Sequence, residues 1–227
     1  MVCLERIAGN LAEVRRVMAA AAARAGRNVD DIRLVAVTKS VGQEETRFLY
    51  DLGLRDFGEN RVADAQEKVD AFAGLDVRWH MIGHLQTNKV RKVLGSYALI
   101  HSVDSVYLME EIERVAETRG QVVDILAQVN VSGEETKTGF RPQDTRSALF
   151  AASEMPHLRV LGLMTMAPLG SDPEQSRPVF RGLRELRDNL RAEGFLLPEL
   201  SMGMTQDYPV AIEEGATMVR VGSALFI

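Results

Sequence analysis

Short apolar runs alternate with longer amphipathic segments along the whole chain. Residues 3–25 carry leucine, isoleucine and valine at spacings of three and four, the periodicity of a helix with one buried face. Residues 32–37 are short, rich in valine and leucine and almost entirely apolar, as expected for a strand buried on both faces. The same two patterns recur to the end of the sequence, which therefore predicts a repeated helix–strand unit.

Seven further predicted strands share this short apolar character. They lie at residues 54–57, 78–82, 97–102, 122–131, 158–164, 199–202 and 218–221, and the predicted helices at 43–52, 61–72, 87–95, 105–119, 143–154, 173–193 and 206–214. Strands that alternate with helices pair in parallel through right-handed crossovers. We expect one domain over residues 1–227, a closed (β/α)8 TIM-type barrel with an extra N-terminal helix. An open doubly wound sheet is the alternative, because periodicity does not report closure.

Composition narrows the setting of the protein. The chain has 27 basic and 32 acidic residues, a net charge of −5, and this mildly acidic balance favours neither nucleic acid nor an anionic membrane as partner. Glu5, Arg15 and Arg16 interrupt any apolar run near the N-terminus, so we expect no signal peptide. A single cysteine, Cys3, cannot form an internal disulfide, and no metal site is expected. We therefore expect a cytoplasmic protein.

The loops that follow barrel strands carry function, and Lys39 directly follows the first apolar strand. We expect this lysine to be buried at the barrel centre. Burial lowers the pKa of a lysine, and the neutral amine is the form that makes Schiff bases. The alternative is a lysine whose amine reaches solvent from the barrel mouth.

The last two strand ends combine glycine with serine. Ser201 and Gly203 lie at the seventh strand, and Gly222 and Ser223 follow the eighth. Glycine lets backbone N–H groups approach an anion, hydroxyls add donors, and barrels often bind phosphate at these two corners. Two ordinary glycine turns would give the same pattern.

Arg220 lies inside the apolar strand at 218–221, where an arginine is costly unless it is paired or bound to a ligand. A guanidinium cannot give up its proton. Facing a pyridine nitrogen, Arg220 would be the donor and the nitrogen would stay unprotonated. A structural ion pair with Glu59 or Asp207 is the alternative.

Eight motifs, in order along nearly the whole chain, carry a resemblance to a known family. They read LVAVTK at 34–39, FGEN at 57–60, WHMIGHLQTNK at 79–89, NVS at 130–132, KTG at 137–139, GLMTM at 162–166, LSMGMT at 200–205 and VRVG at 219–222. Each motif is modest alone, but together they are highly specific. The chain resembles the pyridoxal-phosphate homeostasis proteins, which look like the N-terminal barrel of alanine racemase without its second domain.

The resemblance implies pyridoxal 5′-phosphate (PLP) as the cofactor and assigns its binding residues. Lys39 matches the lysine that holds PLP as a Schiff base, and Arg220 matches the residue that faces the pyridine nitrogen. The positions that match the phosphate cradle are Ser201, Met202, Gly222 and Ser223. Those that match residues near the cofactor face are Asn60 and His80.

The resemblance further implies a cofactor carrier or reservoir in intracellular PLP homeostasis, with PLP-dependent apo-enzymes as candidate partners. We expect a monomer without a defined catalytic turnover. An arginine at the ring nitrogen weakens the electron sink that carbanion chemistry needs, and no second domain is expected to supply an acid or base opposite Lys39. A PLP-dependent amino-acid racemase or related lyase is the alternative, with Tyr208 as the tyrosine that could swing toward the pocket; a structural barrel is the third reading.

Overall fold

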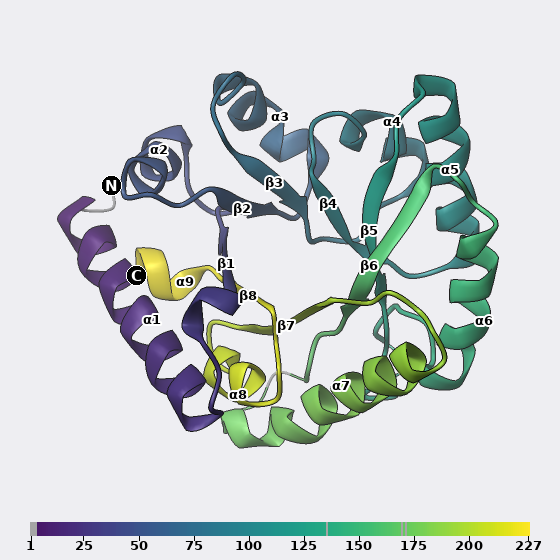
Figure 1. The fold of residues 1–227 in the computed structure, drawn as a ribbon. Helices are drawn as coiled ribbons and strands as arrows, with labels where there is room; N and C mark the ends of the chain where they lie inside the picture. The colour runs from purple at the N-terminus through teal and green to yellow at the C-terminus, as the bar shows by residue number, and fades with distance from the viewer. Residues whose placement is uncertain (1–3, 135, 169, 171) are drawn as a thin grey trace.

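Eight parallel strands follow one another around a closed barrel in the computed structural model, which describes residues 4–134, 136–168, 170 and 172–227 (Figure 1). The strands are β1 (Arg33–Val37), β2 (Asp56–Glu59), β3 (Arg78–Met81), β4 (Leu99–Val103), β5 (Val123–Gln128), β6 (Leu158–Met164), β7 (Glu199–Met204) and β8 (Met218–Val221). Pairing of β1 with both β2 and β8 closes the ring. The predicted barrel is confirmed and the open sheet is excluded.

Helices cover the outside of the barrel (Figure 1). They are α1 (Leu4–Arg24), α2 (Gln43–Asp51), α3 (Val62–Ala71), α4 (Val90–Val93), α5 (Val106–Arg119), α6 (Pro142–Ser153), α7 (Arg177–Ala192), α8 (Tyr208–Glu213) and α9 (Ser223–Phe226). The predicted extra N-terminal helix is present as α1. Its predicted start at residue 3, together with Cys3, lies outside the described residues. Helix α9 was not predicted, because four residues are too few to show a periodicity.

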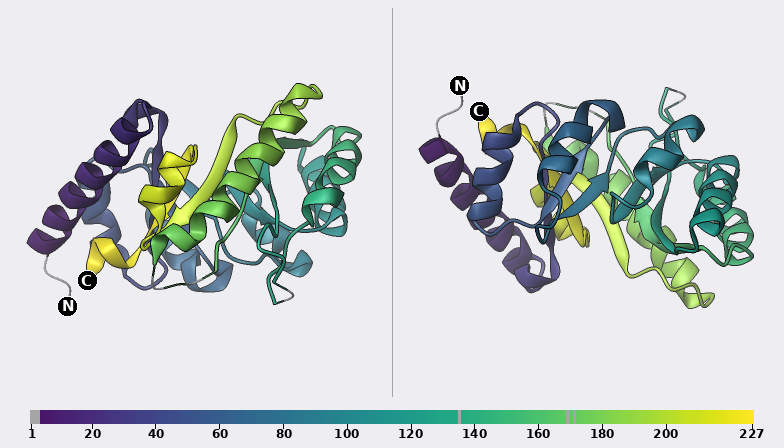
Figure 2. Two further views of the ribbon diagram at one scale, coloured as in Figure 1. Left: turned by 90° about the horizontal axis from the view of Figure 1, so that it is seen from below. Right: turned by 90° about the horizontal axis from the view of Figure 1, so that it is seen from above.

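Helix α1 packs against the last two helices of the chain rather than against the strands alone. Its buried stripe includes Ile7, Leu11 and Val14, the spacing that one helical face requires. Arg6 and Asn10 donate hydrogen bonds to the backbone carbonyls of Phe226 and Leu225 at 3.3 and 3.2 Å, respectively. Figure 2 shows α1 beside the C-terminal segment in both views. The N-terminal helix therefore supports the end of β8 and α9 from outside.

The interior of the barrel is divided between apolar and polar side chains. A small apolar cluster of Leu99, Leu126, Met164 and Met218 is separate from the large core between strands and helices. Buried polar residues of β2, β3, β4, β7 and β8 occupy the remaining interior. No helix of the described residues is long and apolar enough to cross a bilayer.

Candidate functional site

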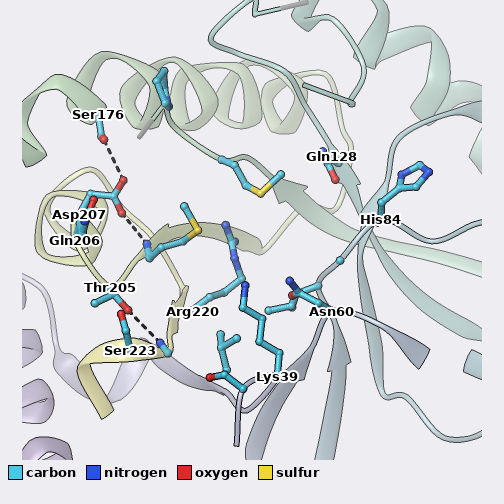
Figure 3. A pocket seen from close by; sticks show the side chains of 18 of the residues that line it. Lys39, Asn60, His84, Gln128, Ser176, Thr205, Gln206, Asp207, Arg220 and Ser223 are labelled. Atoms are coloured by element: carbon cyan, nitrogen blue, oxygen red, sulfur yellow. Dashed lines mark hydrogen bonds between the residues drawn. The ribbon is translucent and has the colours of Figure 1, made fainter. Parts of the chain in front are cut away.

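A cavity of about 540 Å³ lies at the carboxyl ends of the strands, where a barrel of this type places its functional loops (Figure 3). Loops after β1, β2, β3, β7 and β8 contribute to its wall. Five of the eight predicted site residues line it: Lys39, Asn60, Arg220, Gly222 and Ser223. The sequence motifs thus converge on one place, although they lie up to 184 residues apart (223 − 39).

Lys39 extends from the end of β1 into the cavity, toward Arg220 and Asn60 (Figure 3). Its side chain is exposed, so the predicted burial at the barrel centre is wrong and the alternative, an amine open at the barrel mouth, holds. The strand ends at Val37 and the chain turns outward at residues 39 and 40, which carries the side chain beyond the packed layers. The amine is therefore accessible to a ligand that enters from solvent.

A buried ion pair fixes the backbone directly before Lys39. The Nζ of Lys68 donates to Oε1 of Glu59 and to the carbonyl of Thr38, each at 2.7 Å. The hydroxyl of Thr38 donates to the same Glu59 oxygen at 2.6 Å. Since Glu59 also precedes Asn60, this cluster holds two cavity-lining residues, Lys39 and Asn60, on one rigid base.

The corner formed by the last two strand ends contains the predicted anion site. Gly222 is the residue before α9, and its N–H donates to Oγ1 of Thr205 at 3.1 Å. Gly203 has a φ of 88°, and a Cβ atom there would lie 2.5 Å from the Cβ of Ala211. Only glycine can therefore make this turn, which brings the β7 loop against α8. Gly222 and Ser223 line the cavity from the opposite side to Asn60.

Asp207 fixes the loop that follows β7. Its Oδ1 accepts the N–H of Met204 at 2.7 Å, and its Oδ2 accepts the hydroxyl of Ser176 at 3.0 Å (Figure 3). Thr205, Gln206 and Asp207 line the cavity but were not assigned to the site from the sequence. Their signal was available, because they form a polar run directly after a predicted functional strand end.

Three predicted site residues do not line the cavity. Ser201, Met202 and His80 are buried within their strands, with exposed fractions of 0%, 0% and 1%, respectively. Met202 packs in the large apolar core, whereas Ser201 and His80 join a polar network inside the barrel. The structure therefore gives no support for direct contact between these three side chains and a ligand in the cavity. Phosphate binding at Ser201 and Met202, which we expect chiefly through backbone N–H groups, stays a prediction.

Arg220 lies at the floor of the cavity and makes two described hydrogen bonds. Its Nη1 donates to Oγ of Ser201 at 2.5 Å and its Nη2 to the carbonyl of Thr165 at 3.0 Å. Burial lowers the pKa of Arg220 to about 10, so the guanidinium remains protonated at neutral pH. Within the described residues it forms no ion pair with Glu59 or Asp207, so the alternative of a structural pair with either carboxylate is wrong.

No tyrosine lines the cavity among the described residues. Tyr208 is buried at the start of α8, and its hydroxyl interacts electrostatically with the charges of Glu13 and Arg16 on α1. Burial raises the pKa of this phenol. The tyrosine that could have swung toward the pocket thus faces the N-terminal helix.

The geometry suits a ligand that combines a reactive carbonyl, a hydrogen-bond acceptor in a flat ring and an anion. Lys39 offers an accessible amine, Arg220 a fixed cationic donor, and the Gly222–Ser223 corner backbone N–H groups. The cavity volume is within the usual range for small-molecule sites, about 300–1,000 Å³. These residues fit PLP, whose aldehyde, pyridine nitrogen and phosphate are three such groups.

Comparison with known proteins defines first the class of barrel. The family model of the alanine racemase N-terminal domain matches residues 2–227, so the chain has the barrel of that class. A pyridoxal phosphate homeostasis protein of Aquifex aeolicus is 48% identical over 204 residues, which are 89% of this chain and 90% of that relative. The chain belongs to the family of pyridoxal phosphate homeostasis proteins, and the resemblance found in the motifs is confirmed.

Two solved structures show the same fold over nearly the whole chain. A protein of Bifidobacterium adolescentis has a TM-score of 0.92 and 36% identity, over 98% of this chain and 95% of its own. PipY of Synechococcus elongatus, solved with PLP bound, has a TM-score of 0.85 and 35% identity, over 97% of this chain and 100% of its own. The second of these relatives therefore has a structure in which the cofactor is present.

Proposed function

We propose that this protein binds PLP in the cavity, holds it as a Schiff base on Lys39, and acts as a carrier or reservoir in PLP homeostasis. One observation carries the proposal: an accessible lysine, a buried arginine and a glycine–serine corner face one another across a single cavity. The family membership and the PLP-bound structure of PipY support the same cofactor.

Each side of the cavity has a separate role in this proposal. PLP supplies an aldehyde that reacts with a neutral amine, and the exposed position of Lys39 lets the cofactor enter and leave. Arg220 is a donor that cannot accept, so it binds the ring nitrogen in its unprotonated form. The N–H groups of Gly222 and Ser223 bind the phosphate. The Thr205 hydroxyl accepts from the Gly222 N–H in the structure, and it would release this N–H and turn to donate to the anion.

A carrier fits the cavity better than a racemase does. Racemisation needs a second acid or base opposite the lysine. No tyrosine of the described residues lines the wall, both oxygens of Asp207 accept hydrogen bonds, and Nδ1 of His84 lies 3.1 Å from Asp104. An arginine at the ring nitrogen also weakens carbanion stabilisation. We propose delivery to PLP-dependent apo-enzymes, a monomeric state and a cytoplasmic location as the finer parts of this function.

Borohydride reduction followed by peptide mass mapping tests the Schiff base. We expect one PLP adduct on Lys39 and its loss in Lys39→Ala. A main adduct on Lys89 or Lys137 would overturn the assignment.

Gly222→Val tests the phosphate corner. A Cβ at this position would lie 3.3 Å from the Cβ of Val37, so one of the two must move by a few tenths of an ångström, and the branched methyl groups of valine would crowd the anion. We expect PLP to bind at least about tenfold more weakly, a change of roughly 1.4 kcal/mol in binding free energy. Undiminished PLP binding by a folded Gly222→Val would show that the phosphate lies elsewhere.

Two assays separate the carrier from an enzyme. Transfer of PLP to an apo-enzyme should proceed with the loaded protein and fail with Lys39→Ala. Turnover of a panel of L- and D-amino acids should stay far below ordinary enzymatic rates, roughly 1–10³ per second. Lys39-dependent racemisation in that range would replace the carrier reading with an enzymatic one.

A further inference from the structure

A continuous chain of hydrogen bonds crosses the barrel interior and ends at Arg220. Nε2 of His80 lies 2.9 Å from Oδ1 of Asp56, and Nδ1 of His80 lies 2.9 Å from Nε2 of His101. Nδ1 of His101 lies 2.8 Å from Oγ of Ser201, which accepts from Nη1 of Arg220 at 2.5 Å. The five residues come from β2, β3, β4, β7 and β8, and all are buried.

Arg220 is a fixed donor at one end of this chain. A guanidinium only donates, so the Ser201 oxygen is the acceptor in its bond with Arg220. The single hydroxyl proton of Ser201 is then free to point at Nδ1 of His101. In that arrangement this nitrogen accepts, and the proton of a neutral His101 lies on Nε2, where it faces Nδ1 of His80.

The carboxylate of Asp56 fixes the same direction from the other end. Arg78 binds Asp56 with two hydrogen bonds of 2.8 and 2.6 Å, and Arg33 lies 3.8 Å away. Burial alone would raise the pKa of Asp56, but the bonds from Arg78 and His80 outweigh it and leave the pKa below its ordinary value. An ionised Asp56 needs a donor, so His80 carries its proton on Nε2 and offers Nδ1 as an acceptor.

With neutral rings, the ionised Asp56 therefore requires Nε2–H tautomers at His80 and His101, and the donor Arg220 at the other end is compatible with the same arrangement. Burial lowers the pKa of both histidines, that of His101 well below its ordinary value, with the charges of Arg220 and Arg33 adding to the effect at His101. A proton added to either ring would place a donor against a donor along the chain. The bond at that nitrogen, His80–His101 or His101–Ser201, would then have to reverse or break.

We propose that Asp56, His80, His101 and Ser201 are positioning residues, which fix the orientation of the Arg220 guanidinium for a hydrogen bond to the ring nitrogen of the cofactor. This inference rests on the proposed function, because it assigns a purpose to the network through PLP. The Ser201 oxygen accepts from Arg220, and the contact of Ser201 with Nδ1 of His101 holds this hydroxyl in place. The Thr165 carbonyl binds the second terminal nitrogen, so the guanidinium plane is fixed at two points.

The network also explains why Ser201 and His80 occur in the family motifs without lining the cavity. They act on the cofactor through Arg220 rather than by contact. A network that only stabilised the barrel would leave the ring nitrogen of a bound cofactor unaffected. A positioning network and a purely structural network therefore differ in their effect on the pKa of the bound ring nitrogen.

The first test uses the ligand-free protein. Two-dimensional ¹H–¹⁵N spectra of the histidine rings, assigned with His80→Gln and His101→Gln, report which nitrogen carries the proton. We expect the Nε2–H tautomer at both residues at neutral pH. An Nδ1–H tautomer or a charged ring at either position overturns the proposed direction, whether or not the protein binds PLP.

The second test uses the loaded protein and PLP labelled with ¹⁵N at the ring nitrogen. In the parent the ¹⁵N chemical shift of the ring nitrogen should be that of an unprotonated pyridine and should stay constant from about pH 6 to 9. This range spans the ordinary pKa values of histidine and cysteine side chains. In Ser201→Ala the guanidinium loses one of its two described acceptors and opposes ring protonation less. We expect the pKa of the ring nitrogen to rise by about half a unit or more and PLP to bind about tenfold more weakly.

Thr145→Val is the matched control for loss of a buried hydroxyl. Thr145 lies in α6, is fully buried, and bonds only the Arg141 carbonyl within its own helix. It should lower the melting temperature without moving the ring-nitrogen titration. If Ser201→Ala lowers stability but leaves that titration at the parent position, the network is structural and the proposal fails. If the parent binds no PLP, the proposed function fails, and the tautomer measurement still decides the network.

Discussion

Lys68→Met should destabilise the barrel strongly, because it leaves the Glu59 carboxylate buried without its cation. The side chains of Lys68 and Glu59 are 8% and 3% exposed, and their charged atoms lie 2.7 Å apart. Removing one partner of such a buried pair costs about 3–5 kcal/mol in the free energy of unfolding. At roughly 2–4 °C per kcal/mol for a domain of this size, the melting temperature should fall by about 6–20 °C.

The assay is urea unfolding followed by the fluorescence of Trp79, the one tryptophan of the chain, which is buried on β3. Loss of Lys68 also removes the donor to the Thr38 carbonyl, so PLP binding at Lys39 should weaken in the same variant.

A double variant distinguishes the buried charge from lost packing. In Glu59→Gln/Lys68→Met neither charge of this buried pair remains, and the glutamine oxygen can still accept the hydrogen bond from the Thr38 hydroxyl. The double variant should be more stable than Lys68→Met, with a coupling energy of about 0.5–3 kcal/mol between the two sites. The reasoning is refuted if Lys68→Met unfolds within about 1 kcal/mol of the parent, or if the double variant is the less stable of the two.

Three further predictions follow from named contacts. Gly203→Ala places a Cβ 2.5 Å from the Cβ of Ala211 at a φ of 88°. It should lower the free energy of unfolding by about 1–3 kcal/mol and weaken PLP binding. A melting temperature equal to that of the parent would contradict this. Because burial lowers the pKa of His101 well below its ordinary value, the unfolded state binds the extra proton, and the free energy of unfolding should fall by about 1 kcal/mol from this residue between pH 7 and 5.5. Denaturant titrations of the parent and His101→Gln check this, since the parent should have the steeper loss toward acid. Asp207→Asn keeps Oδ1 as an acceptor for the Met204 N–H but offers an amide group to the Ser176 hydroxyl. PLP dissociation should become two- to tenfold faster, because a hydrogen bond of this kind contributes ~1 kcal/mol. An unchanged dissociation rate would show that Asp207 does not fix the loop.

The order of elements could be predicted from the sequence because each strand and helix has its own periodicity. Boundaries shifted most where the pattern was weakest: the strand expected at 54–57 lies at Asp56–Glu59, and the one expected at 122–131 ends at Gln128. Beyond that point Val129 makes only an isolated bridge to Phe140. Closure of the sheet depends on pairing between β1 and β8, which are far apart in sequence and leave no local signal.

The site was predicted in part, and the errors have a common physical origin. A motif shows that a residue matters, but not whether its side chain points into a cavity or into the barrel interior. Ser201 lies three residues before the end of β7 and faces inward, whereas Thr205, just beyond the strand, lines the cavity. His101 was not assigned to the site, because its contacts with His80 and Ser201 join residues 21 and 100 positions apart.

The packing of α1 against α8 and α9 has a consequence for synthesis of the protein on the ribosome. The first helix emerges with an apolar stripe whose partners, Tyr208–Glu213 and Ser223–Phe226, are made last. At about 5–20 residues per second, the 184 residues from Ala25 to Tyr208 (208 − 24) take roughly 10–40 s to translate. During that interval the stripe of Ile7, Leu11 and Val14 lacks the two helices against which α1 mainly packs, although α2, which is made early, also contacts α1. The nascent chain thus exposes the apolar face of α1 until translation is nearly complete, which makes α1 the segment that a ribosome-associated chaperone would bind.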